Sequence, residues 1–153
     1  MNPMTLQKHP YGAFLGLALL LFPLTLVVAG LVLQSWDHLQ YFGEAFASNA
    51  QRPVVVVGIT IYFLGPFLLL GVMCASLAKR KGSRAAMVLL AFGAVLLGLT
   101  CILGFQDSLT AKARHAWTVM ALSTGLIPFF SLPALLSCAC LRWYFLRRSG
   151  LSR

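Results

Sequence analysis

The sequence predicts an all-α integral membrane protein, in which a single domain over residues 1–153 forms a bundle of four transmembrane helices. Apolar residues make up 59% of the chain and charged residues only 10%. The mean hydropathy is +0.86, and the apolar residues are concentrated in four long uncharged runs. A soluble domain of this size has too small a core to bury so many apolar side chains, so most classes of soluble enzyme are excluded.

The four runs are long enough to cross a bilayer as helices. A hydrocarbon core of about 30 Å requires roughly 20 apolar residues of helix, and none of the runs contains Asp, Glu, Lys, Arg or His. Backbone amides in hydrocarbon must be satisfied within the segment, which favours helices over the shorter, alternating strands of a barrel. The predicted helices span residues 11–33, 53–78, 85–105 and 116–141.

The first run also has the position of a secretory signal, because Lys8 precedes it. The apolar region of a signal peptide is only about 7–15 residues long, whereas the whole of 11–33 is uncharged. We therefore expect the first run to be retained as a transmembrane helix.

Residues 34–52 predict a short amphipathic helix in the first outer loop. On a helical projection Trp36, Leu39 and Phe42 fall on one side, and the polar residues fall opposite. A helix of this kind lies on the membrane surface, caps the bundle or binds a partner through its acidic face. The candidate partner-facing residues of the outer loops are Trp36, Asp37, His38, Glu44 and Asp107.

The second outer loop is predicted at residues 106–115. Asp107 and Ser108 at its start have side chains that cap helices, so one of them is expected to begin the helix that continues into Trp117.

Positive charges predict the orientation of the bundle. Nine Lys and Arg residues lie before the first helix, between the second and third, and after the fourth, against three in the other two loops, where all three acidic residues also lie. By the positive-inside rule, both termini and the loop at 79–84 are cytoplasmic. The basic segments are expected to contact anionic lipid. They surround no nucleic-acid-binding module, so nucleic acid is not an expected partner.

Helices in lipid associate through small residues that let their backbones approach. Gly12 and Gly16 form a GxxxG motif in the first run, and each other run has small residues on one projected face. We expect these faces to point into the bundle. The candidate helix-packing residues are Gly12, Gly16, Gly58, Gly65, Ala94, Gly98, Ala121 and Gly125.

Motifs for catalysis or cofactor binding are absent from the sequence. The predicted spans lack the ionisable residues that mark proton relays and ion pathways, and no metal-ligand spacing such as HExxH occurs. The four cysteines lie in apolar runs, where free thiols behave as small hydrophobes. An enzyme is therefore not the expected class, and no cofactor or metal is expected. The remaining alternative is a site built from His38 and His115 with the outer acidic residues.

The working hypothesis is a non-catalytic multi-pass protein that binds another membrane protein, as an accessory subunit or as an immunity-type protector. The alternative is a transporter or channel for a small solute, ion or lipid, working as a self-associated bundle. Prolines and hydroxyl residues in the spans favour this alternative, but most of those hydroxyls are expected to bond back to their own helix. Small bacterial inner-membrane proteins, some immunity proteins among them, share this four-span plan. That analogy of architecture makes the inner membrane the expected location.

Overall fold

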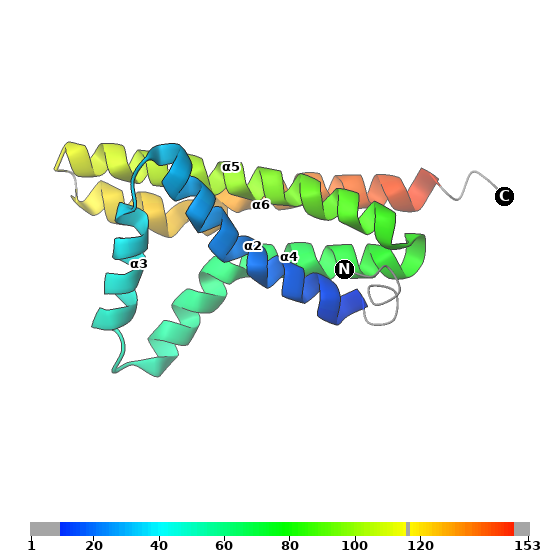
Figure 1. Cartoon of the computed structure of the whole chain (residues 1–153), viewed down its shortest axis with the longest axis horizontal. Coiled ribbons are helices and arrows are strands. Elements are labelled where there is room, and N and C mark those ends of the chain that lie inside the picture. The colour runs from blue at the N-terminus through cyan, green and yellow to red at the C-terminus, as the bar shows by residue number, and fades with distance from the viewer. Residues whose placement is uncertain (1–9, 116, 149–153) are drawn as a thin grey trace.

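The computed structural model describes residues 10–115 and 117–148, without the side chains at 38, 41, 45, 117, 119–123 and 148. Almost all of the described residues are helical (Figure 1). The helices are α2 (Pro10–Leu33), α3 (Asp37–Ser48), α4 (Pro53–Lys81), α5 (Ser83–Ala113) and α6 (Trp117–Arg148). The described part of the chain contains no strand, so the all-α class predicted from the sequence is confirmed.

Four of these helices are long and apolar enough to cross a membrane. The candidate spans are Pro10–Leu33, Pro53–Lys81, Ser83–Ala113 and Thr124–Arg147. Each is longer than the roughly 20 residues that a bilayer core requires. The chain is therefore a multi-pass membrane protein with the four spans that the hydropathy pattern predicts.

The second predicted loop is mostly helix. α5 continues to Ala113, and the chain turns only at Arg114 and His115, where His115 adopts a φ of 53°. Asp107 and Ser108 therefore lie inside α5, and the prediction that one of them caps the next helix is wrong. Hydropathy detects only the apolar part of a helix, whereas backbone hydrogen bonding continues until the chain turns.

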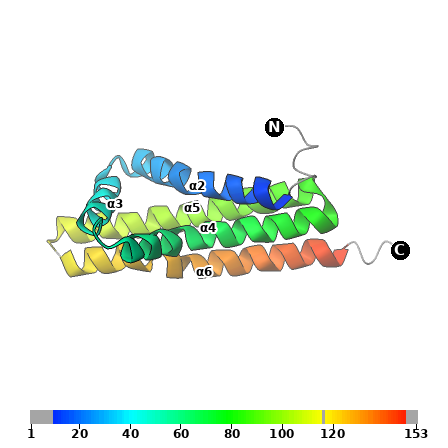
Figure 2. The same ribbon diagram turned by 90° about the horizontal axis from the view of Figure 1, so that it is seen from below.

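The helices form a bundle in which α5 and α6 run side by side along the longest axis (Figure 1). α4 packs against both, and α2 lies across α4 and α5 (Figure 2). Fully buried side chains from several helices fill the space between them, including Phe14, Leu70 and Leu97. α2 begins and α6 ends at the same end of the molecule, as an even number of spans requires (Figure 1).

α4 changes direction part-way along its length (Figure 1). Pro66 lies inside this helix, where it provides no N–H for the carbonyl of residue 62 and its ring crowds that carbonyl. The first part of α4 consequently diverges from α5 and α6 and leads back to α3. We call residues 53–62 the arm.

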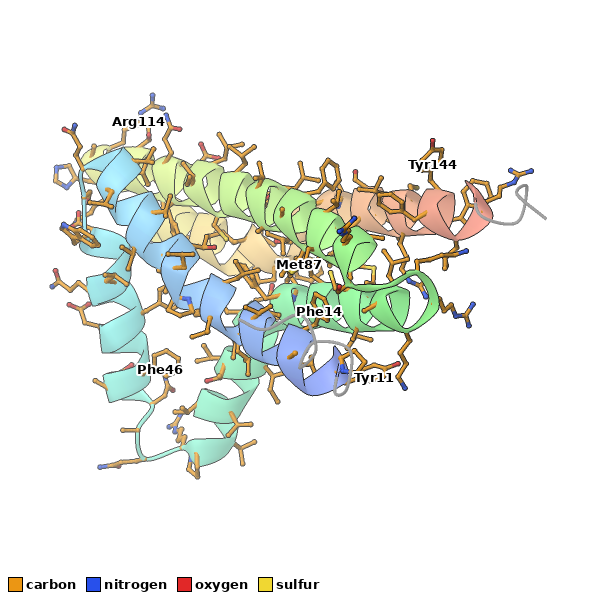
Figure 3. All side chains as sticks on the ribbon, turned by 45° about the vertical axis from the view of Figure 1, so that its right-hand side comes forward. Tyr11, Phe14, Phe46, Met87, Arg114 and Tyr144 are labelled. Atoms are coloured by element: carbon orange, nitrogen blue, oxygen red, sulfur yellow. The ribbon has the colours of Figure 1, made fainter. Side chains whose placement is uncertain are left out.

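The two ends of the bundle differ in charge. Arg114 lies at the end that carries α3, which we call the α3 end, and Tyr144 lies near the opposite end (Figure 3). The described cations of that opposite end, the basic end, are Lys79, Arg80, Lys81, Arg84, Arg142 and Arg147. All three acidic residues of the sequence belong to α3 or to the adjacent end of α5.

Aromatic rings accompany the cations at the basic end. The ammonium group of Lys79 lies 4.6 Å from the centroid of the Tyr11 ring. The guanidinium of Arg147 lies 5.0 Å from the Trp143 ring. Amphipathic rings and basic side chains of this kind collect at the headgroup level of a membrane.

Candidate functional site

α3 is attached to the bundle by Phe42, whose side chain is only 7% exposed. Its ring makes edge-to-face contacts with Phe22, Phe63 and Phe105, with centroid distances of 6.3, 4.8 and 6.2 Å. These three rings belong to α2, α4 and α5, and such pairs contribute about 0.5–1.5 kcal/mol each beyond their buried area. Phe46 points from α3 toward the start of α4 (Figure 3). The apolar face of α3 therefore packs onto one end of the bundle.

Two further contacts fix the N-terminal end of α3. Lys112 of α5 lies 2.8 Å from the carboxylate of Asp37, and about 40% of each side chain remains exposed. An exposed pair of this kind contributes about 0–1 kcal/mol. The indole of Trp36 covers Gly30, where a Cβ would lie 2.5 Å from the ring. Only glycine allows the indole to lie this close to the α2 backbone.

The predicted partner-facing residues are thus divided among different contacts. Trp36 and Asp37 pack at the start of α3, and Glu44 accepts a hydrogen bond of 2.9 Å from the Gln40 side chain. Asp107 is exposed on α5. The side chain of His38 lies outside the described residues.

The arm has little cover from its own chain. None of residues 53–62 is buried, and Val54, Val57 and Ile61 are 83, 55 and 61% exposed. The hydroxyl of Tyr62, at the end of the arm, donates a 2.7 Å hydrogen bond to the carbonyl of Gly125 on α6. This bond joins the arm to the bundle just before the bend at Pro66.

The closest backbone approaches between helices do not use the glycines predicted from the sequence, although the carbonyl of Gly125 accepts the hydrogen bond from Tyr62. A Cβ built at Gly12, Gly16, Gly58, Gly65, Gly98 or Gly125 would meet nothing within 4 Å. A Cβ at Gly71 would lie 2.9 Å from the Cβ of Ala18 and 3.1 Å from the carbonyl oxygen of Phe14 on α2. One at Gly93 would meet the side chains of Leu70 and Cys138.

The close approaches in the structure therefore occur at other glycines than those expected. Adjacent residues on a helix point about 100° apart, so a face chosen by composition alone is easily misplaced by one position. Gly65 and Gly98 line grooves, and Gly12 and Gly58 are exposed, so these four remain candidates for contacts with another chain. The side chain of Ala121 lies outside the described residues.

Two apolar grooves open on the outside of the bundle. The α2–α5 groove has a volume of about 280 Å³, and the predicted small residues Ala94 and Gly98 line it beside Thr25. The α4–α6 groove has a volume of about 200 Å³ and lies between the proline-containing turns at Pro66 and Pro128. Neither groove is lined by a charged residue, so each suits an apolar occupant.

Hydroxyl groups in the spans mostly bond to their own helix, as the sequence predicts. Five of these hydroxyls each donate a hydrogen bond of 2.7–3.0 Å to the carbonyl four residues earlier in the chain. The residues are Thr25, Thr60, Thr100, Ser131 and Ser137. Thr124 instead donates to the hydroxyl of Ser108 on α5 at 3.0 Å. Each of these hydroxyls therefore has a hydrogen-bond acceptor within the chain.

Among the described residues, no group of three His, Cys, Asp or Glu side chains lies close enough to hold a metal ion. The four cysteines are free thiols, and Cys74, Cys101 and Cys138 are buried in the apolar interior. The side chain of His38, one member of the predicted outer metal site, lies outside the described residues, and the described members of that site form no such group.

Comparison with protein-family models, curated proteins and solved structures found no match. The function of the chain is therefore inferred from its own geometry.

A second tie between α4 and α6 lies near the basic end, and sequence reasoning did not predict it. The Nε–H of Arg142 donates a 3.0 Å hydrogen bond to the hydroxyl of Ser76, and this hydroxyl in turn donates to the carbonyl of Met73 at 2.8 Å. A single sequence does not reveal which helices are neighbours, so the pairing of α4 with α6 could not be inferred from spacing alone.

Proposed function

We propose that this chain is a non-catalytic protein of the bacterial inner membrane that acts by binding another membrane protein, as an accessory subunit or as a protector. The observation that carries the proposal is the arm, an apolar stretch of helix in which residues 53–62 are all unburied. A helix that diverges from its bundle makes fewer dispersion contacts with the other helices of the bundle. A partner helix packed against the arm would restore them.

Both ends of the arm are fixed in position. Pro66 bends α4 on one side, and on the other the chain enters α3, which Phe42 anchors in the bundle. The arm is therefore preorganised to receive a partner, which lowers the entropic cost of binding. Gly58 is exposed on the arm, and a Cβ added there would meet nothing within 4 Å. A second helix can therefore approach the backbone of the arm closely at this glycine.

Polar groups beside the arm supply the means for specificity. Glu44 on α3 and Arg52 at the start of α4 are both exposed. A partner helix would insert its apolar side chains against the arm and meet these two charges at the membrane surface. Charges at the rim of an interface select partners more than they add affinity.

Photo-crosslinking in native membranes tests the proposal. Val57 on the arm and Val88 on α5 are the same residue type with the same exposed fraction, 55%, so they form a matched pair for a photoreactive amino acid. We expect position 57 to yield a discrete crosslinked protein species and position 88 to yield none. Crosslinking to lipid alone at both positions would overturn the proposal.

Transport through a self-associated bundle is the second candidate, and the structure offers it less support. Phe67, Leu89 and Phe105 are at most 2% exposed inside the bundle, and most of the described hydroxyls of the spans donate to carbonyls of their own helix. Solute flux above that of empty vesicles, measured with purified protein in liposomes, would favour transport over partner binding.

A further inference from the structure

We infer that the seam between α4 and α6 binds one anionic phospholipid, with the phosphate at Arg142 and Arg80 and an acyl chain in the α4–α6 groove. This site is separate from the arm and does not depend on the proposed function. Two independent features carry the inference: an oriented guanidinium and an apolar groove that lie on the same seam.

Arg142 has the properties of a phosphate ligand. It is half-buried, and its Nε–H is fixed by Ser76 at 3.0 Å, which leaves the donors of its two terminal nitrogens for another acceptor. The three Asp and Glu residues of the sequence all belong to the far end of the bundle, so no side-chain carboxylate neutralises this guanidinium. Arginine binds phosphate through two parallel hydrogen bonds.

Arg80 adds a second positive charge to the same place. It follows Ser76 by four residues on α4 and therefore lies on the same face of that helix, one turn nearer its end. Its neighbour Lys79 lies over the Tyr11 ring, which belongs to α2 and not to this seam. Two arginines on opposite sides of a seam suit one phosphate group.

The groove is aligned with this pair of arginines. On α4, Leu69 lines the groove and precedes Ser76 by seven residues; on α6, Leu135 lines it and precedes Arg142 by seven. Residues seven apart differ by only about 20° around a helix and by about 10 Å along it. The groove thus begins about 10 Å below Arg142, within the roughly 15 Å that one leaflet provides for an acyl chain, and Arg80 lies about 6 Å farther toward the membrane surface.

The other groove does not have this combination. The α2–α5 groove contains Thr25 as its polar residue, and that hydroxyl is engaged by the carbonyl of Leu21. It therefore offers an acyl chain no charged anchor. The pairing of groove and guanidinium on the α4–α6 seam distinguishes a specific lipid site from the general affinity of the basic end for an anionic membrane.

Native mass spectrometry of the purified full chain tests the site, with phosphatidylglycerol and phosphatidylcholine supplied in equal amounts. We expect the wild type to retain one phosphatidylglycerol in preference to phosphatidylcholine, and Arg142→Gln to reduce that retention about tenfold. Arg84→Gln removes the same charge at the start of α5 and is expected to retain the lipid. Arg142→Lys, which keeps the charge but loses the two-pronged geometry, is expected to retain an intermediate amount.

A substitution in the groove separates a lipid from a bare phosphate. Gly65 lines the groove and has open space at its Cβ position, so Gly65→Leu fills the groove without touching the arginines. We expect it to reduce lipid retention, and we expect inorganic phosphate to displace little of the lipid from the wild type. Full retention by Gly65→Leu, or equal loss in Arg84→Gln and Arg142→Gln, would overturn the proposal. If Gly65→Leu and Arg142→Gln lost self-association but kept the lipid of the wild type, the seam would bind a second copy of the chain instead of a lipid.

Discussion

At the scale of single residues, Gly71 sets the distance between α2 and α4. Its missing side chain lets the α2 backbone approach so closely that a Cβ would lie 2.9 Å from the Cβ of Ala18 and 3.1 Å from the Phe14 carbonyl oxygen. A carbonyl oxygen on a helix cannot move aside as the end of a flexible side chain can. Any larger residue must therefore push the two helices apart.

Gly71→Ala is expected to destabilise the bundle by about 1–3 kcal/mol, the usual cost of overpacking a tight contact. Thermal unfolding in mild detergent measures the effect. Gly58→Ala is the matched control, because it makes the same substitution on the same helix at a position with nothing within 4 Å. We expect the control to stay within about 0.5 kcal/mol of the wild type. A comparable loss in both variants would contradict the role assigned to Gly71.

Residue-scale packing was the part of the fold least accessible from the sequence. The pattern favoured the face of α4 that contains Gly58 and Gly65, whereas the close contact uses Gly71. In lipid, apolar residues cover every face of a helix, so hydropathy shows no polar side from which to infer the buried one. The hydroxyl bonds were predictable because they depend only on local geometry within one helix.

At the scale of elements, Phe42 makes the central packing contact between α3 and the bundle. Phe42→Ala removes a ring that contacts α2, α4 and α5, and the loss is on the order of 3 kcal/mol for a buried aromatic residue. We expect amide hydrogen exchange in α3 to rise by about 100-fold. Leu39→Ala truncates a side chain of the same helix that is 37% exposed. If amide hydrogen exchange in α3 rose equally in this control, Phe42 would not be the residue that holds α3 on the bundle.

The bend in α4 has a separate test. Pro66→Ala restores a backbone N–H for the carbonyl of residue 62 and removes the clash of the ring, so α4 is expected to straighten. Spin labels at Val57 on the arm and Leu103 on α5 should then report a shorter distance than in the protein that retains Pro66. An unchanged distance would mean that packing against α3, and not the proline, holds the arm apart.

The boundaries of the helices could be predicted from the sequence only in part. The start of α2 and of α4 was predicted to within one residue, because an uncharged run begins abruptly at each. The end of α5 was missed, because residues 106–113 are polar enough to resemble a loop while remaining helical. Their hydrogen bonds are satisfied within the helix, and side-chain polarity does not interrupt them.

At the scale of the whole molecule, helix length exceeds what the bilayer requires. α5 and α6 contain 31 and 32 residues, and helices of this length extend about 45–50 Å, against a hydrocarbon core of about 30 Å. Their ends therefore reach the headgroup regions, where the charged residues lie. The folded bundle therefore places all three acidic residues at one end and most of the basic residues at the other.

This separation predicts the orientation of the protein in the cell. Nine basic residues in the terminal and 79–84 segments, against three in the other loops, predict that the basic end faces the cytoplasm. In a Cys140→Ser background, where the remaining cysteines are buried, a membrane-impermeant maleimide is expected to label Gln51→Cys in intact cells and to leave Lys81→Cys unlabelled. Both positions should react once the cells are opened, which controls for accessibility. Labelling of residue 81 in intact cells would place the basic end outside, and the lipid site at Arg142 would then lie in the opposite leaflet.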